Sequence, residues 1–354
     1  MPRFFSHKGH SGSALIIVLW AVVLLGFAVA IASEKVGLVM GDAAIRARRV
    51  QAELLAQSSF TYLDKILQDE RKHNLETGKG NHAQGRRLDL NRFQGIWHSE
   101  KLEAGGGTFW IEIEDEQSRI NWIKTPSYVW RNLFRSAGLK PEQVDAWFDC
   151  LTDWQDADDV RSLNGAETFD YEALKENPRK AKNAPVTEMG ELYWIMGGAE
   201  LLDLQVPVDF DGNIKPLLPY TTIDGDGKIN INTAPPFLIA AALDLPIEKA
   251  EQIVQKRWGP DGIEGTEDDV YLDGLPDVQG QTTTPQAGTP AISPTSSAIT
   301  TSSNYFRVRG VGEFQEQHVV CEALAVRDGQ GGLTLLRLPR TIEKKKAIAQ
   351  DTSL

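Results

Sequence analysis

The chain has 354 residues and a formal net charge of -12, with 41% hydrophobic and 24% charged residues. This composition excludes a disordered chain, and the length predicts two or three domains. The acidic balance argues against a nucleic-acid-binding protein, because proteins that neutralise phosphates concentrate Lys and Arg. The two cysteines, Cys150 and Cys321, lack metal-ligand spacing, and the sequence leaves open whether they pair.

The N-terminus begins with a short polar segment, residues 1–12, which carries Arg3 and Lys8. From Ala14 to Ala32 the chain has about nineteen residues without a charge, close to the length that crosses a bilayer as a helix. We therefore expect a single transmembrane helix over residues 13–33. Because the positive charges precede it, the N-terminus is predicted to stay in the cytoplasm and the rest of the chain to be exported.

Three interpretations of this N-terminus compete: a cleaved secretory signal, an uncleaved signal anchor and a prepilin-type leader. The small residues from Ala28 to Ala32 resemble a signal-peptidase site. Against a cleaved signal, apolar residues recur near helical spacing from Val36 to Leu67, interleaved with charges. A membrane helix that continues into a long amphipathic helix is the layout of pilins.

The leader resembles a prepilin processing site, at which a prepilin peptidase cleaves after Gly12 and leaves Ser13 as a methylated N-terminal residue. On this interpretation Ile17 is the fifth mature residue. Most pilins and pseudopilins carry Glu there, where it neutralises the amino terminus of a neighbouring subunit. The resemblance therefore implies that a subunit with Ile17 needs no subunit above it, which suits the tip of a fibre.

The rest of the chain predicts a mixed fold. Gly105–Asp115 alternates apolar and acidic residues and predicts a strand. Helical periodicity follows in Tyr128–Ala137, Pro141–Thr152, Glu188–Leu192 and a second block, Pro236–Arg257. Strand-like alternation returns in Tyr305–Val311, His318–Ala325 and Leu333–Leu338. This order predicts an α+β fold in which helices are inserted into the chain of a sheet domain.

The expected organisation has eight segments along the chain. They are a leader (1–12), a transmembrane helix (13–33), a first part of the sheet domain (34–117), a first helical subdomain (118–222), a second helical subdomain with acidic loops (223–280), a low-complexity linker (281–303), a second part of the sheet domain (304–340) and a solvated tail (341–354).

Several segments of the predicted insertion occur together and in order. They are Ser118–Asn121, Leu151–Asp159, Asn164–Glu167 with Tyr171, Thr187–Leu192, Ile229–Pro235 and Ala250–Arg257. With the leader and the C-terminal strands, this series resembles the K-type minor pseudopilins of bacterial type II secretion systems over nearly the whole chain. That family characteristically lacks Glu at the fifth mature position, which matches Ile17.

This resemblance implies a pilin-like fold: a long transmembrane and amphipathic helix packed on a small antiparallel sheet, with an insertion of two SAM-like, helix-hairpin-helix-like subdomains. It implies an assembly protein rather than an enzyme, without a nucleic-acid or small-molecule partner. The expected function is to form the pseudopilus tip complex with I- and J-type minor pseudopilins. Prepilin peptidase and inner-membrane lipid are its other expected partners, with the C-terminal domain in the periplasm.

Two alternative functions remain open. The first is a minor pilin of a type IV pilus or competence system, which has the same fold in another machine. The second is a membrane-anchored DNA-binding protein, because Ile229–Pro235 followed by Ala250–Arg257 also resembles a helix-hairpin-helix unit. Acidic residues around this unit argue against phosphate binding, and Thr233 is instead expected to cap the next helix.

Two acidic loops are predicted to bind Ca2+. The first places Asp224 and Asp226 at alternate positions between glycines. The second, residues 259–270, lacks Lys and Arg; its expected ligands are Asp261, Glu264, Thr266, Asp268 and Asp269, with Glu267 and Asp273 nearby. Oxygen donors at this density suit Ca2+, and Mg2+ less well; the alternative is a solvated acidic turn. The K-type resemblance also implies bound calcium, which we assign to the second loop.

A third acidic run, Asp153–Asp159, is interpreted as structural. Its carboxylates stand within one or two helical turns and offer either an acid–base pair or ligands for a hard cation. No nucleophile lies nearby in the sequence, so we expect a helix end whose Asp side chains cap backbone N–H groups and pair with Arg161.

Overall fold

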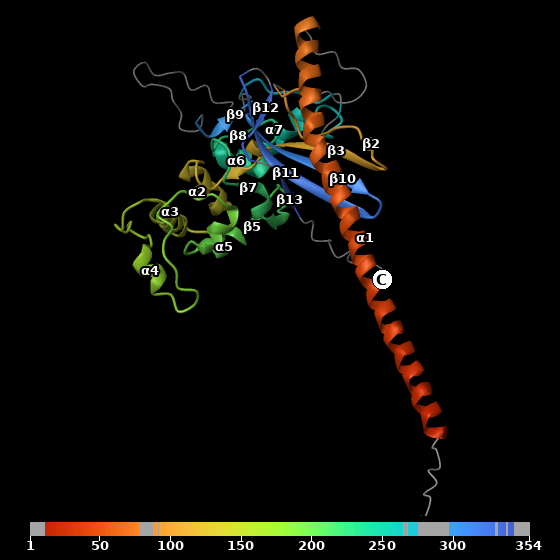
Figure 1. The fold of residues 1–354 in the computed structure, drawn as a ribbon. Coiled ribbons are helices and arrows are strands. Elements are labelled where there is room, and N and C mark those ends of the chain that lie inside the picture. Colours follow the sequence, from red (N-terminus) through yellow and green to blue (C-terminus); the bar gives the residue numbers. More distant parts are fainter. Residues whose placement is uncertain are drawn as a thin grey trace, which may run out of the picture.

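In the computed structural model, one long helix carries a head built from an antiparallel sheet and a group of helices (Figure 1). The structure describes residues 11–77, 88–90, 92–264, 266, 268–274, 297–329, 332–337 and 339–342. Residues 1–10 of the predicted leader, most of the predicted linker and residues 343–354 of the predicted tail lie outside these ranges.

Helix α1 runs from Ser11 to Thr77. Its first half is apolar and exposed, and Leu15, Trp20 and Phe27 each leave more than 60% of their surface uncovered. A mean hydropathy of 3.0 over 18 residues makes α1 long and apolar enough to cross a membrane, by length and composition. The predicted continuation of an apolar helix into a long amphipathic one is therefore confirmed.

The second half of α1 packs against the sheet. Ala52, Ala56, Leu63 and Leu67 recur at spacings of four and seven residues, which places them on one helical face, and each is at most 5% exposed. This face contacts the three longest strands. Burial of this apolar face of α1 thus holds the head on the helix.

The sheet has seven strands, and all of its pairs are antiparallel. Its main order is β1-β3-β10-β11-β12, while β2 pairs with β3 and β13 pairs with β11. The strands are β1 (Ile96–His98), β2 (Leu102–Ala104), β3 (Gly107–Asp115), β10 (Tyr305–Phe314), β11 (Gln317–Arg327), β12 (Leu333–Leu335) and β13 (Arg340–Ile342). The central pair, β3 with β10, joins segments that lie far apart in the sequence.

Two glycines of β10 let the backbone of α1 approach the sheet. A Cβ at Gly310 would lie 2.0 Å from Ser59 Oγ and 2.3 Å from the Ala56 carbonyl oxygen. A Cβ at Gly312 would lie 2.0 Å from the Ala52 carbonyl oxygen. Because these neighbours include helix backbone, any larger residue would push α1 away from the sheet.

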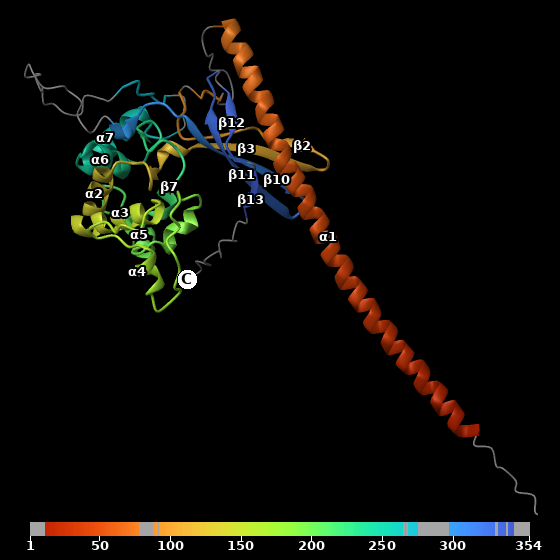
Figure 2. The same ribbon diagram turned by 60° about the vertical axis from the view of Figure 1, so that its left-hand side comes forward.

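The chain between β3 and β10 forms the insertion. Figure 2 shows its helices on the side of the sheet away from α1. The helical elements are η1 (Glu116–Ser118), α2 (Ser127–Ser136), α3 (Pro141–Gln155), α4 (Thr168–Glu172), η2 (Met189–Trp194), α5 (Gly198–Leu202), η3 (Leu218–Tyr220), α6 (Pro236–Leu243) and α7 (Ile247–Arg257). Short strand pairs join them: β4 (Ile120–Asn121) with β7 (Thr221–Thr222), β5 (Gln205–Pro207) with β6 (Ile214–Pro216), and β8 (Ile229–Asn230) with β9 (Ile299–Thr300).

The insertion and the sheet domain have separate hydrophobic cores. Aromatic rings fill the insertion core, where Trp122 stacks on Trp130 with centroids 4.0 Å apart and meets Trp147 edge-on at 4.7 Å. The second core lies between α1 and the sheet. Cys150 belongs to the first core and Cys321 to the second, and both are free thiols.

The structure confirms the α+β architecture with a helical insertion, and the predicted strands and helices overlap β3, α2, α3, β10, β11 and β12. The predicted helix Glu188–Leu192 overlaps the 3-10 helix η2, and the predicted strand Leu333–Leu338 is shorter, since β12 ends at Leu335. The second helical block is two helices, because Asp244 adopts a left-handed conformation (φ 52°) and ends α6. The expected cap by Thr233 is wrong: its hydroxyl donates to Asp115, and Pro235 precedes α6. Strand β13 shows that the sheet extends to Ile342.

Candidate functional site

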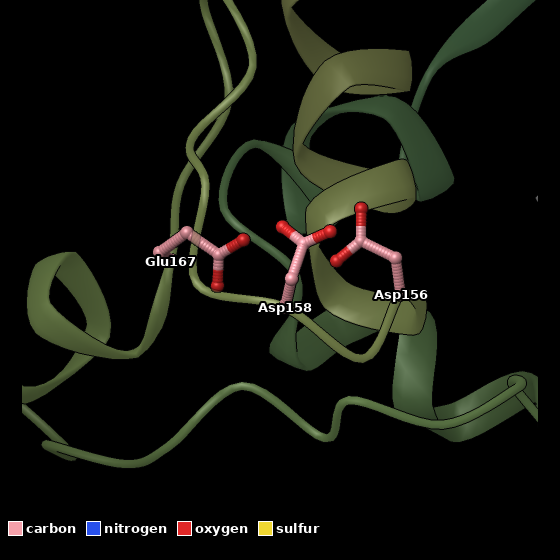
Figure 3. A group of neighbouring side chains, drawn as sticks. All are labelled: Asp156, Asp158 and Glu167. Carbon is pink, nitrogen blue, oxygen red and sulfur yellow. The ribbon is translucent and has the colours of Figure 1, made fainter.

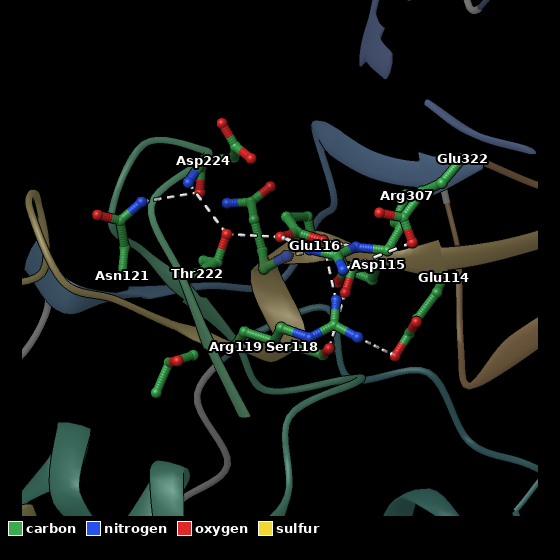
Figure 4. A network of polar contacts seen from close by, with 12 residues as sticks. Glu114, Asp115, Glu116, Ser118, Arg119, Asn121, Thr222, Asp224, Arg307 and Glu322 are labelled. Carbon is green, nitrogen blue, oxygen red and sulfur yellow. Dashed lines mark hydrogen bonds and ion pairs between the residues drawn. The ribbon is translucent and has the colours of Figure 1, made fainter. Parts of the chain in front are cut away.

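A buried polar network lies where the insertion leaves and re-enters the sheet (Figure 4). Glu116 accepts hydrogen bonds from Arg307 Nε (2.8 Å) and Nη2 (2.6 Å), from Arg119 Nη1 (2.8 Å) and from the Thr222 hydroxyl. Burial alone would raise the pKa of the Glu116 carboxyl, but the two arginines outweigh it and hold the pKa below its usual value. Glu116 is therefore ionised, and its contacts connect the end of β3 with β7 and β10.

The neighbouring carboxylate, Asp115, joins two more segments. It is fully buried and accepts hydrogen bonds from the Thr233 and Ser303 hydroxyls, the Asn230 amide and the Gln117 backbone N–H. Burial raises the pKa of Asp115, and these hydrogen bonds offset only part of that rise. Both carboxylates have full sets of protein donors, which suits a structural joint between the sheet and the insertion.

The first predicted calcium loop contributes to the same joint. Asp224 pairs with Arg337 at 2.8 Å, and Asp226 accepts a hydrogen bond from the Gln117 amide at 3.0 Å. The Lys124 ammonium donates to a carbonyl of the loop at 2.6 Å. The protein thus places two of its own cations at this loop.

The second predicted loop turns its side chains toward one another and toward α7. Asp268 accepts hydrogen bonds from the Thr266 hydroxyl (2.6 Å) and the Asp261 backbone N–H (3.0 Å), which lower the pKa of Asp268. Glu264 lies 3.5 Å from Arg257. Glu267 lies outside the described residues. Among the described residues of this loop, no three carboxylates share one centre.

Three other carboxylates do share a centre, at the end of α3 (Figure 3). Asp156 directly follows α3, Asp158 lies two residues on, and Glu167 directly precedes α4. One oxygen from each lies within 4.8 Å of the others, and Figure 3 shows the carboxylates turned toward one another. Oxygens on opposite sides of a Ca2+ ion are at most about 4.8 Å apart, given Ca–O distances of about 2.4 Å. The spacing therefore fits one ion.

The electrostatics of this cluster also fit a cation. Glu167 is 4% exposed, and neither of its carboxylate oxygens has a hydrogen-bond partner among the described residues. Asp156 Oδ1 is in the same situation. Burial first, and then the negative charges around them, raise the pKa of both carboxyls. Unpaired buried anions are costly, so a hard cation at this position would stabilise the fold.

One glycine explains how Glu167 reaches this cluster. A Cβ at Gly165 would lie 1.9 Å from Asp153 Oδ2, so the returning chain passes directly over α3. Asp153 accepts the Ser162 N–H, and Asp158 accepts the Val160 N–H at 2.9 Å, as expected for backbone capping. The expected pairing of this run with Arg161 is wrong, since that side chain bonds Asp170.

The predicted processing residues lie at the start of α1. Gly12 and Ser13 belong to its first turns, and Ile17 is 67% exposed on the apolar half of the helix.

The helix hairpin α6–α7 presents fewer cations than its sequence suggests. Arg257 is 3% exposed, because its guanidinium donates to the carbonyls of Ile231 (3.0 Å) and Ala234 (2.7 Å).

Comparison with known proteins identifies relatives of one kind. The family model described as type II secretion system protein K matches residues 87–202, a span that contains all three clustered carboxylates. The type II secretion system protein K of Pectobacterium carotovorum is 27% identical over 271 residues, which cover 70% of this chain and 75% of that protein. The protein of the same name from Pseudomonas aeruginosa is 31% identical over 175 residues, covering 46% and 48% of the two chains.

A solved structure has the same fold. A chain of the GspK-GspI-GspJ complex from the enterotoxigenic Escherichia coli type 2 secretion system aligns with a TM-score of 0.52 and 18% identity. The alignment covers 84% of this chain and 100% of that chain. The likeness therefore extends over most of this chain.

Proposed function

Because the chain belongs to the type II secretion system protein K family, we propose that it is a minor pseudopilin that joins I- and J-type minor pseudopilins in the tip complex of the pseudopilus. The observation that carries this proposal is the alignment with the whole of a chain from a solved GspK-GspI-GspJ complex. Its role is then assembly: the complex initiates or caps the pseudopilus during protein export across the outer membrane.

The exposed half of α1 supports an anchored assembly protein. The described residues of the chain leave its apolar side chains uncovered, although an apolar patch of this size needs a partner that shields it from water. A bilayer covers them before assembly, and the helices of neighbouring subunits cover them afterwards. The topology that follows is a single pass through the inner membrane, with the N-terminus in the cytoplasm and the head in the periplasm.

Two features support the tip rather than the shaft of the fibre. Ile17 supplies no carboxylate for the amino terminus of another subunit. The insertion widens the head on the side of the sheet away from α1 (Figure 2). A subunit with this shape and this residue is suited to a position that no subunit follows.

We further propose that Asp156, Asp158 and Glu167 bind one Ca2+ ion. The support is the shared centre of their oxygens and the buried Glu167 oxygens without hydrogen-bond partners among the described residues. The ion would neutralise the three carboxylates, and these residues would then hold the end of α3 against the start of α4. Loop 259–270 remains the alternative location for the Ca2+ ion.

Two rival functions have less support. A minor pilin of a type IV pilus or competence system has the same fold, but the matching relatives named above are secretion-system proteins. A DNA-binding role for α6–α7 is disfavoured, because Arg257 donates to backbone carbonyls in the core instead of facing solvent. A gel shift that weakens with salt would be required to support the DNA-binding role.

The test is co-purification of the full-length chain with its I- and J-type partners from detergent-solubilised membranes. We expect a complex with one copy of each subunit, and a mature K-type chain that starts at Ser13 only when prepilin peptidase is present. A chain that starts near Ser33, or one that never joins I and J, would contradict the proposal.

A further inference from the structure

We propose that the lower surface of the insertion, made by α4, the segment 173–182 and the end of η2, rests on the bilayer that α1 crosses. This surface is called the α4 surface below. The inference rests on the membrane anchor of the proposed function and goes beyond it, because it assigns the head a second contact with lipid.

The α4 surface exposes aromatic side chains. Phe169 on α4 is 80% exposed, and Trp194 and Tyr193 at the end of η2 are 50% and 41% exposed. Trp and Tyr are the residues enriched where a protein meets the membrane–water interface, since their rings are apolar at one end and polar at the other. Phe169 adds a wholly apolar ring. Exposure of these three rings to water gains nothing, whereas a headgroup layer would cover them.

The three segments form one continuous surface. The Arg179 guanidinium lies 5.4 Å from the Tyr171 ring of α4 and 5.5 Å from the Trp194 ring. Its Nε donates to the Trp194 carbonyl at 2.9 Å. Arg179 therefore ties η2 to α4, and its cation lies among the aromatic rings, where a lipid phosphate would find a partner.

Charge on the α4 surface is nearly balanced. Segment 173–182 carries four basic residues and one acid, and α4 adds the acids Asp170 and Glu172. Two of the basic residues already have partners, because Lys182 bonds Glu191 at 2.7 Å and Lys180 lies 3.8 Å from Glu172. Attraction to anionic lipid is therefore weak, and the aromatic rings are expected to supply most of the affinity.

The α4 surface lies at the end of the head that faces the same way as the N-terminal half of α1. In both views of the molecule, α4 hangs below the sheet and to one side of α1 (Figures 1 and 2). The apolar run of α1 ends before Glu34, and its first buried core residue is Ala52, so about 18 residues, or roughly 27 Å of helix, separate bilayer from sheet. A helical unit of about 100 residues is roughly 30 Å across, which is enough to bridge that distance.

A matched pair of labelled variants tests the contact in the full-length chain. Glu176→Cys places a probe on the α4 surface, and Asp211→Cys places one beside Phe210, an aromatic residue that is 61% exposed and whose N–H bonds Glu251 of α7. The native thiols are buried and do not compete for the label. Both variants are reconstituted into vesicles of phosphatidylethanolamine and phosphatidylglycerol that carry a shallow nitroxide lipid quencher.

We expect at least twofold stronger quenching of the probe at residue 176 than at residue 211, and little change with salt. Adding Phe169→Ala and Trp194→Ala to the Glu176→Cys variant should reduce quenching to the level of the control. Equal quenching at both positions would overturn the inference. Shielding of residue 176 only after I- and J-type subunits are added would also overturn it, since the surface would then bind a subunit.

Flotation of the vesicles after an alkaline wash separates the two proposals. A chain that floats but shows equal quenching retains its anchor and loses only the second contact. A chain that fails to float contradicts the anchor, and the inference built on it fails as well.

Discussion

Glu116 and Arg307 form a bidentate ion pair between the first residue after β3 and the third residue of β10, with N–O distances of 2.6 and 2.8 Å. The pair connects the two points at which the insertion leaves and rejoins the sheet (Figure 4). The Glu116 side chain has no exposed surface, so its charge depends on these arginine contacts.

Arg307→Met should destabilise the full-length chain by about 3–5 kcal/mol, because it leaves Glu116 buried with one partner fewer. Thermal and denaturant unfolding in detergent, followed by tryptophan fluorescence, measures the loss. The control is Arg131→Met, whose pair with Asp145 is exposed and should contribute no more than about 1 kcal/mol. Equal effects of the two variants would show that the Glu116 pair is unimportant.

Gly310→Ala should loosen α1 from the sheet. The new Cβ would overlap the Ala56 carbonyl and the Ser59 hydroxyl, and overpacking of this kind costs about 1–3 kcal/mol. Gly190→Ala is the matched control, because a Cβ there has nothing within 4 Å. Hydrogen exchange of β10 and of α1 from Ala52 onward reports the loosening. Unchanged exchange in Gly310→Ala would contradict the close approach.

Calcium should raise the melting temperature of the wild-type chain by several degrees. A ligand at a hundredfold excess over its Kd stabilises by about 2.7 kcal/mol. Asp158→Asn should abolish this response and, in chelator, be at least as stable as the wild type, because it removes a repulsive charge. Asp268→Asn should keep the response. If instead Asp268→Asn abolished the response and Asp158→Asn kept it, the ion would bind at loop 259–270.

Glu191 predicts an acid-sensitive contribution to stability. Burial alone would raise the pKa of its carboxyl, but hydrogen bonds from Lys182, Thr187 and the Glu188 N–H lower it to about 2. A lowered carboxyl pKa stabilises the fold fully above about pH 4.5, and this contribution is lost as the pH falls toward 2. Glu191→Gln should therefore be less stable at pH 7. Its melting temperature should also fall less than that of the wild type between pH 5 and pH 2. A slope equal to that of wild type would rule out this contribution.

Ile17→Glu should leave the head folded while impairing the tip role, because the new carboxylate would accept another subunit above. The measurements are secretion of a reporter substrate and the ratio of K to I and J subunits in purified complexes. Ile17→Leu is the control and should match the wild type. Normal secretion and an unchanged ratio in Ile17→Glu would count against the tip argument.

Local pattern in the sequence was enough to predict α1, the long strands and the main helices. Strand β3, for example, alternates buried and partly exposed residues from Phe109 to Asp115. Contacts between distant segments were not predictable in this way. Thr233 has the residue type and the position of a helix cap, yet its hydroxyl donates a hydrogen bond to Asp115, which lies 118 residues earlier in the chain.

The same limit applies to the candidate metal site. The density of acidic residues pointed to loop 259–270, whose described carboxylates bond neighbours in the loop or approach Arg257. The cluster at α3 depends on Glu167, which returns to Asp156 only because Gly165 lets the chain pass over Asp153. No periodicity marks such a return, so the sequence alone favoured capping there.

The pairing of β3 with β10 also dictates an order of events during biogenesis. On the proposed topology, β3 has no neighbour on the β10 side until the whole insertion has crossed the membrane. An insertion that condenses early around its own tryptophan core brings the two strand ends together, so the late pairing closes a short gap instead of a long loop. Folding of the insertion would then precede closure of the sheet, and any export of the chain would be coupled to that order.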